Sequence, residues 1–142
     1  AVVERVYDGD TFKTTDGEKV RLIGIDTPEK SNNPKLYRDV KKTGHDAETL
    51  KVMGKKAYEY VKPLIQGKKV RLETDVQPRD KYGRLLAYVY LEDGTFVNAQ
   101  IIRDGYAYPL TIPPDVKYAD LFQRYFQEAQ RLKKGLWAEG TK

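Results

Sequence analysis

The sequence predicts an α+β fold in which five short strands form a small β-barrel covered by three α-helices. Two observations indicate it: five short segments of apolar and β-branched residues are bounded by turn signals, and longer segments carry apolar residues at helical spacing. A twisted antiparallel sheet of this size tends to close into a barrel, because closure removes its edges. The length of 142 residues is that of one ordinary domain, so we expect a single domain over residues 1–142.

The N-terminal segments predict a meander of three strands, at Val2–Tyr7, Thr11–Thr15 and Lys19–Ile25. The pairs Asp8-Gly9 and Asp16-Gly17, which separate these segments, are strong signals for tight turns. Because the connections are so short, consecutive strands should be antiparallel neighbours.

The middle of the chain predicts a loop and then a long helix. Lys30–His45 has no clear hydrophobic period, and we expect a long, basic, mobile loop there. Ala47–Ile65 carries apolar residues at helical spacing and is followed by the helix-ending pair Gln66-Gly67. Gly54 interrupts this pattern, so we expect the first turns of the helix to be separate or frayed.

The next segments predict two more strands and a short helix. Val70–Thr74 alternates apolar with polar residues, which is typical of a half-buried strand. Val76–Gly83 is polar and predicts a loop, and Arg84–Leu91 is the fifth predicted strand. Val97–Arg103 predicts a short helix that closes at Asp104-Gly105.

The C-terminal part predicts an irregular segment and a final helix. Tyr106–Pro114 contains three prolines and should lack regular structure. The helix after it has an apolar face made of Tyr118, Leu121, Phe122, Tyr125, Ala129 and Leu132. Gly135 ends this helix, and we expect Leu136 and Trp137 to hold the C-terminus against the core.

The composition limits the possible functions. The net charge of +5 and the pI of about 9.2 by themselves favour an ordinary solvated surface over an anionic partner such as nucleic acid, so the motifs must decide between the two. The absence of cysteine excludes disulfides, thiolate zinc sites and cysteine nucleophiles. His45 is the only histidine, which argues against a histidine-based nuclease site. No apolar run is long enough to cross a membrane, so we expect no membrane insertion.

Two aspartates at strand ends are candidate metal ligands. If Asp10 and Asp26 converge, their mutual repulsion favours a bound cation, and the Thr27 backbone carbonyl can add a third oxygen. Oxygen ligands without histidine or cysteine indicate Ca²⁺ or Mg²⁺, with Mn²⁺ also possible, and argue against zinc. The alternative is that both are ordinary turn residues, which is the interpretation we adopt for Asp8.

Two arginines and a glutamate complete a possible phosphate site. Arg21 lies in a predicted strand and Arg84 follows Gly83 at the start of another, so the pair can hold a phosphodiester and stabilise its developing charge. Glu29 lies just past the turn and can act as a general base. Lys81 and Tyr82 flank Arg84 and can touch a phosphate. The alternatives are surface salt bridges and a solvated loop.

One geometric condition applies to this site. Strict alternation along a strand places Arg21 and Asp26 on opposite faces. A bulge or a sharp bend at Gly24 would bring both side chains to the same side, and glycine within a strand often marks such a bend.

Three motifs in this order resemble the staphylococcal nuclease (thermonuclease) family. They are Asp8-Gly9-Asp10-Thr11, Arg21-Leu22-Ile23-Gly24-Ile25-Asp26-Thr27-Pro28-Glu29 and Asp80-Lys81-Tyr82-Gly83-Arg84. The resemblance runs from about Val6 to Trp137. It implies an OB-fold, that is, a five-stranded antiparallel β-barrel with three α-helices. It also implies a Ca²⁺-dependent phosphodiesterase that cuts DNA and RNA and leaves a 3′-phosphate and a 5′-hydroxyl.

The resemblance also implies a role for each motif residue. Asp10, Asp26 and the Thr27 carbonyl correspond to the calcium ligands of the family, and Glu29 corresponds to the general base or the residue that orders the attacking water. Arg21 and Arg84 correspond to the phosphate-binding and transition-state arginines, and Lys81 and Tyr82 to substrate contacts.

The chain departs from the secreted bacterial enzyme in two places. Its loop from Lys30 to Glu48 is longer and differently built, which leaves substrate access there open. After Gly105 the register of Tyr106 and Tyr108 is unclear, so we assign base stacking to neither.

The sequence therefore favours a nuclease of low sequence specificity acting on single- or double-stranded DNA and RNA. We expect a monomer, secreted or associated with the cell envelope. The rival interpretation is a non-catalytic module of the same fold that binds nucleic acid or peptides, and a plain structural domain is the third. The complete set of acids and arginines favours the enzyme.

Overall fold

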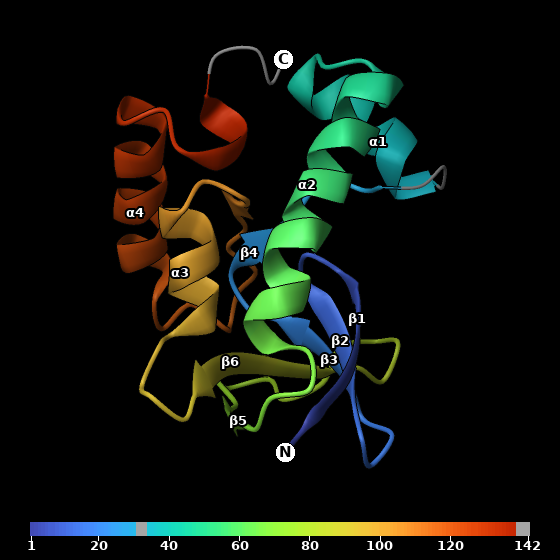
Figure 1. Cartoon of the computed structure of the whole chain (residues 1–142), viewed down its shortest axis with the longest axis vertical. Coiled ribbons are helices and arrows are strands. Elements are labelled where there is room, and N and C mark those ends of the chain that lie inside the picture. The colour runs from blue at the N-terminus through green and yellow to red at the C-terminus, as the bar shows by residue number, and fades with distance from the viewer. Residues whose placement is uncertain (31–33, 139–142) are drawn as a thin grey trace.

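The computed structural model describes residues 1–30 and 34–138 and confirms an α+β fold (Figure 1). Within the described residues the elements are β1 (Val3–Asp8), β2 (Thr11–Thr14), β3 (Lys19–Leu22), β4 (Ile25–Asp26), α1 (Pro34–Thr43), α2 (Ala47–Ile65), β5 (Val70–Glu73), β6 (Leu85–Leu91), α3 (Val97–Arg103), β7 (Tyr108–Pro109), α4 (Ala119–Arg131) and the 3₁₀ helix η1 (Gly135–Trp137).

Five strands form the main sheet in the order β1-β2-β3-β6-β5, and β4 pairs with β7 in a separate two-stranded ribbon. β1, β2 and β3 are antiparallel neighbours joined by short turns, as the sequence predicts. Their buried side chains, among them Val6, Phe12 and Val20, face the main core.

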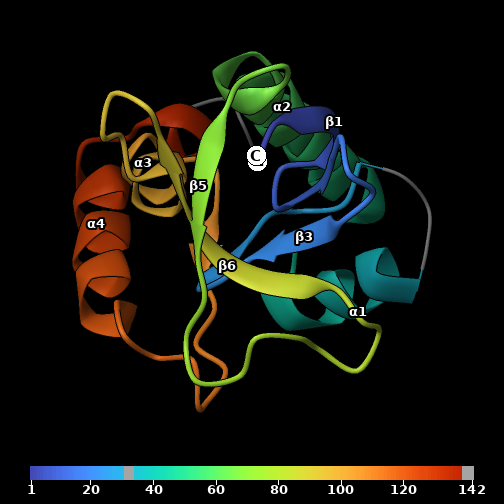
Figure 2. The same ribbon diagram turned by 90° about the horizontal axis from the view of Figure 1, so that it is seen from below.

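The prediction of a wholly antiparallel sheet is wrong at the centre, because β3 and β6 run parallel with Val20 opposite Leu85 (Figure 2). A parallel pair needs a long connection, and the chain between these strands includes α1, α2 and β5. The sheet is also not closed. β1 and β5 are its two edge strands, and the short segments before them are joined by an isolated bridge between Val2 and Lys69.

The helices differ from the prediction at two positions. A helix, α1, occupies Pro34–Thr43, where we expected loop, while residues 31–33 of that predicted loop lie outside the described residues. α2 is continuous through Gly54, so the predicted interruption is wrong. Gly54 serves packing instead: a Cβ there would stand 2.5 Å from the Pro28 carbonyl oxygen and from the Glu29 backbone. α2 therefore needs a glycine to receive this loop.

The helices cover the sheet and close the core. α2 packs on β1, α3 packs on β6 and α4, and Leu136 of η1 joins a small cluster with Leu36, Leu50 and Met53. The C-terminal segment is thus held against the core as expected. Among the described residues, the structure has no helix with the length and apolar character needed to span a membrane.

Candidate functional site

A sharp bend at Gly24 sets the direction of the chain at the end of β3. Gly24 has φ +83°, a left-handed conformation that glycine adopts without strain. A Cβ at this position would also stand 2.4 Å from the Phe122 ring. β4 follows at once and pairs with β7, where Asp26 lies opposite Tyr108. The bend that the sequence required between Arg21 and Asp26 is confirmed.

As a result, Arg21 contacts both candidate metal ligands. Its Nη2 atom lies 3.4 Å from Asp10 Oδ2 and 3.7 Å from Asp26 Oδ1. The three side chains are only 14, 8 and 17% exposed, so water screens their interaction weakly. The Arg21 Nη1 atom also donates to the Leu22 carbonyl at 2.7 Å, which fixes the guanidinium.

Asp10 is held by hydrogen bonds from two neighbours. The Thr27 backbone N–H donates to Asp10 Oδ2 at 3.0 Å, and the Thr11 hydroxyl donates to Asp10 Oδ1 at 3.0 Å. The first bond joins the turn after β1 to the turn after β4. Gly9 permits the approach, because a Cβ there would meet the Thr27 side chain at 2.6 Å. Two segments distant in sequence thus place their carboxylates together.

Asp8, which we interpreted as a turn residue, belongs to the same cluster. Burial and the neighbouring Asp10 raise the pKa of Asp8 to about 8, and Glu29 contributes a smaller increase. Glu29 is therefore within electrostatic range of the carboxylates, although its backbone is anchored against α2 at Gly54. The signal that could have identified Asp8 is its spacing, two residues from Asp10 across one tight turn.

Arg84 is positioned by Asp80, which organises the loop before β6. Asp80 Oδ2 accepts from Arg84 Nε at 2.8 Å, while Asp80 Oδ1 accepts from the backbone N–H of Tyr82 and of Arg84. Partial burial raises the pKa of Asp80, but the bonds from Arg84 outweigh it and hold the pKa below its usual range. Sequence reasoning assigned Asp80 no role of its own.

One pocket brings the two arginines together. We call it the arginine pocket. It has a volume of about 240 Å³, and its polar lining includes Arg21, Asp80, Lys81, Tyr82 and Arg84. The Tyr82 ring is 72% exposed and lies 5.2 Å from Lys81 Nζ and 5.5 Å from the Arg84 guanidinium carbon.

The rest of the arginine pocket is apolar. Leu86 of β6, Leu110 and Ile112 supply wall area beside the cationic side chains. A cationic end beside an apolar wall suits a ligand with a phosphate and a flat base. Asp10, Thr27 and Glu29 do not line this pocket, but Asp10 is next to it because its carboxylate contacts Arg21.

The two tyrosines with unclear register lie elsewhere. Tyr106 stacks on Tyr60 of α2 with ring centroids 4.3 Å apart. Tyr108 contacts Phe126 and Trp137, and with Asp26 it lines a second cavity. Neither tyrosine lines the arginine pocket.

Asn98 supports the site from beneath and was not singled out as a support by sequence reasoning. It is fully buried at the start of α3. Its Nδ2 donates to the Ile23 carbonyl at 2.9 Å and to the Ala87 carbonyl at 3.2 Å, and its Oδ1 accepts from the Val89 N–H. One side chain thereby ties the end of β3 to β6. A buried polar residue so fully bonded fixes local geometry.

The donors at the carboxylates fit a hard cation. Within residues 1–30 and 34–138, the structure has no group of three or more histidine, cysteine, aspartate or glutamate side chains arranged to hold a metal ion. Asp10 and Asp26 bring two carboxylates to the same arginine, and the Thr27 backbone lies beside Asp10, to which its N–H donates. Carboxylate and backbone carbonyl oxygens suit Ca²⁺ or Mg²⁺, which also accept water and phosphate oxygens as ligands.

Comparisons with known proteins agree with this geometry. Residues 19–139 match the family model described as "Staphylococcal nuclease homologue". The Thermonuclease of Staphylococcus intermedius is 39% identical over 141 residues, which cover 96% of this chain and 74% of the relative. The Thermonuclease of Staphylococcus hyicus is 36% identical with the same coverage, and Endonuclease YncB of Bacillus subtilis is 37% identical over 142 residues, 61% of its length.

Proposed function

This chain belongs to the staphylococcal nuclease family, and we propose that it is a metal-dependent nuclease that hydrolyses DNA and RNA with little sequence specificity. The observation that carries the proposal is the position of Arg21. Its guanidinium contacts the carboxylates of Asp10 and Asp26, and its side chain lines the same pocket as Arg84. A phosphate bound by the arginines therefore lies next to the acidic residues.

The two arginines bind and polarise the phosphodiester. Guanidinium groups donate two parallel hydrogen bonds to phosphate oxygens and never lose their charge. Arg84 keeps its orientation because Asp80 holds its Nε atom, which leaves the terminal nitrogens for the substrate. Lys81 and Tyr82 contact the flanking parts of the nucleic acid at the rim of the pocket.

We propose that Asp10, Asp26 and the Thr27 carbonyl would hold the metal ion and that this ion is Ca²⁺. A bound Ca²⁺ would supply positive charge beside the phosphate and a site for water. Arg21 balances the charge of both aspartates in the present structure.

Glu29 is the general base in this proposal. It accepts a proton from the attacking water as the water oxygen bonds to phosphorus in line with the leaving group. The bond from phosphorus to the 5′ oxygen then breaks, and this oxygen gains a proton from solvent. One product carries a 3′-phosphate and the other a 5′-hydroxyl. Arg21 and Arg84 stabilise the charge that grows on the phosphate oxygens.

A non-catalytic binding module is the alternative. Such a module needs the cationic pocket but has no use for a cluster of buried carboxylates beside it. The contact of Asp10 and Asp26 with Arg21 favours the enzyme. We further propose that the protein acts as a monomer, secreted or at the cell envelope. This last point is supported by the sequence resemblance alone.

Degradation of single-stranded DNA tests the proposal. The protein is incubated with the DNA in Ca²⁺ and, in parallel, in excess EGTA, and the ends of the fragments are identified. We expect cutting in Ca²⁺ only, with 3′-phosphate ends. Salt-sensitive binding without cutting in Ca²⁺, Mg²⁺ or Mn²⁺ would show a binding module instead.

A further inference from the structure

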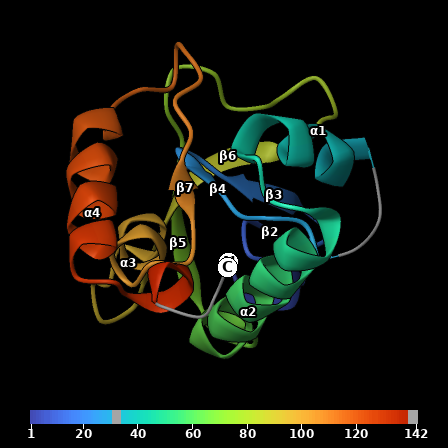
Figure 3. The ribbon, with the colours of Figure 1, turned by 90° about the horizontal axis from the view of Figure 1, so that it is seen from above.

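A second cavity lies beside the carboxylates, on the side away from the arginine pocket's cationic loop. It has a volume of about 200 Å³, and we call it the Tyr108 pocket. Its walls come from β4, β7 and three helices, because Asp26, Tyr108, Asp39 of α1, Leu50 of α2 and Phe126 of α4 all line it. Figure 3 shows the β4–β7 ribbon between α4 and α2, with α1 nearby.

The two pockets adjoin at two points. Leu110 lines both of them. Asp26 of the Tyr108 pocket also contacts Arg21 of the arginine pocket, with Oδ1 and Nη2 3.7 Å apart. A phosphodiester has a nucleoside on each side, and the arginine pocket accommodates one of them. Because Asp26 contacts Arg21 and also lines the Tyr108 pocket, this pocket is within reach of the second nucleoside.

The Tyr108 pocket has the character of a base site. Its volume lies below the range of about 300–1,000 Å³ for drug-sized ligands, which suits one planar base better than a whole nucleotide. Leu50 and Phe126 give it apolar surface. The Tyr108 ring is held by Phe126 and Trp137, with centroids 5.8 and 5.0 Å away, so its hydroxyl has a fixed position.

The Tyr108 pocket contains a hydrogen-bond donor, the Tyr108 hydroxyl, and an acceptor, the Asp39 carboxylate. The Tyr108 side chain lines the cavity, and its hydroxyl can donate a hydrogen bond to an acceptor on a bound base. Asp39 contributes carboxylate oxygens, which only accept hydrogen bonds when ionised. A carboxylate therefore favours bases that present N–H groups at their edge, and guanine presents an imino and an amino N–H side by side.

We propose that the Tyr108 pocket binds the second nucleobase of the substrate, and that Asp39 selects guanine there over thymine. The inference rests on the nuclease function proposed above and adds a specificity residue to it. Guanine can donate two parallel hydrogen bonds to one carboxylate, whereas thymine has a single imino donor flanked by carbonyl oxygens that the carboxylate repels.

Dinucleoside monophosphates with defined bases test this inference. kcat/KM is measured in Ca²⁺ for the guanine–thymine dinucleotide, for its reverse order, and for the thymine–thymine reference. We expect one of the two guanine orders to be cleaved at least about tenfold faster than the reference, because hydrogen bonds to a charged group contribute that much discrimination. Asp39→Asn should abolish most of this preference, and Tyr108→Phe should reduce it.

Asp120→Asn is the matched control, because it removes one aspartate charge from the exposed start of α4, outside the Tyr108 pocket. The control should keep the wild-type preference. Equal cleavage of all three dinucleotides by the wild type would overturn the inference, and so would a preference that survives Asp39→Asn.

A binding measurement separates this inference from the proposed function. The same dinucleotides are titrated into the protein in EGTA, where no cleavage is expected. A guanine preference in affinity that depends on Asp39, together with no cleavage in any metal, supports the base pocket and contradicts the nuclease. Cleavage without any base preference contradicts the base pocket and leaves the nuclease intact.

Discussion

Arg21 connects the two halves of the candidate site through one side chain. Its guanidinium lies between Asp10 and Asp26, and its side chain also forms part of the pocket that contains Arg84. The two carboxylates are thus kept next to the arginine pocket before any substrate or metal arrives.

Arg84 provides a test at the scale of one residue. We expect Arg84→Ala to lower kcat by about 10²–10³ with a modest change in KM, because it removes a donor to charge that develops only in the transition state. Arg84→Lys keeps a positive charge but not the planar fork, so it should recover only part of the rate. Steady-state kinetics on single-stranded DNA in Ca²⁺ measure both variants.

The control for Arg84 is Arg124→Ala, which removes an exposed arginine from α4. It should leave kcat and KM close to wild type. If Arg84→Ala raises KM and leaves kcat unchanged, the residue is a positioning contact for the substrate only.

Sequence reasoning described the proximity of Asp10 and Asp26 as a condition for a metal site, and a bend at Gly24 as the condition for bringing Arg21 to the same side. The structure shows Arg21 in contact with both aspartates, while the roles of these residues stay predictions. Asp8 was missed because an aspartate before glycine has an ordinary explanation as a turn residue. Asp39 was missed for a different reason: it lies on α1, and its position beside Tyr108 depends on contacts distant in sequence.

At the scale of elements, the bend between β3 and β4 determines the geometry of the site. Gly24 makes it possible to change direction within two residues, and Asn98 fixes the strand end by binding the Ile23 carbonyl. Asp26 then pairs across the ribbon with Tyr108. A change at this bend should therefore affect both stability and catalysis.

Gly24→Ala tests the role of the bend. An alanine in this left-handed conformation would strain the backbone by about 1–2 kcal/mol. Its Cβ would also overlap the Phe122 ring, which adds about 1–3 kcal/mol. We expect a matching loss in the free energy of unfolding, measured with urea, and reduced activity in the fraction that remains folded.

Gly94→Ala provides the comparison, because Gly94 has φ +91° and a Cβ there would meet nothing within 4 Å. Gly94→Ala should lose only the part of the free energy of unfolding that comes from backbone strain. If both variants lose equal stability and Gly24→Ala keeps full activity, the packing of Gly24 against Phe122 has no role in placing Asp26.

The element predictions failed where the outcome depends on partners distant in sequence. β6 was placed correctly along the chain, but its parallel pairing with β3 follows from how α2 and β5 return the chain. α1 was missed because Lys30–His45 lacks a regular apolar period, and Leu36 is buried against Leu50, Met53 and Leu136 rather than by a local pattern. Gly54 was misinterpreted because its function is contact with another segment.

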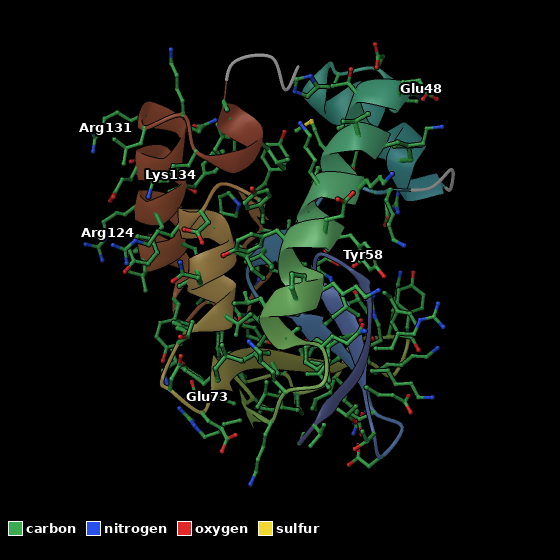
Figure 4. The ribbon with its side chains drawn as sticks, viewed as in Figure 1. Glu48, Tyr58, Glu73, Arg124, Arg131 and Lys134 are labelled. Carbon is green, nitrogen blue, oxygen red and sulfur yellow. The ribbon has the colours of Figure 1, made fainter. Side chains whose placement is uncertain are left out.

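At the scale of the whole molecule, the net charge of +5 does not by itself locate the substrate. Basic residues lie on several faces. Figure 4 shows Arg124 and Arg131 of α4, and Lys134 just after it, on the opposite side of the view from Tyr58. The arginine pocket places such charge beside the acidic cluster, because its Arg21 contacts Asp10.

The salt dependence of DNA binding tests whether the DNA binds at the arginine pocket or simply follows the net charge of the protein. We expect the affinity for single-stranded DNA in EGTA to fall with salt, and the log–log slope to become shallower by about 0.7 for each phosphate contact removed. Lys81→Ala with Arg84→Ala should reduce the slope. Arg124→Ala with Arg131→Ala removes the same charge from α4 and should not. Equal reductions by both pairs would show that binding follows net charge alone.

The most direct test of the central claim, that the acid–arginine cluster performs hydrolysis, is the rate of Glu29→Gln on single-stranded DNA in Ca²⁺. Glu59→Gln, the same change at an exposed position of α2, is the control. We predict that Glu29→Gln lowers the rate by at least about 10²–10⁴ while its affinity for DNA in EGTA stays unchanged. A near-normal rate for Glu29→Gln would contradict the account, because the water would then be activated by another group.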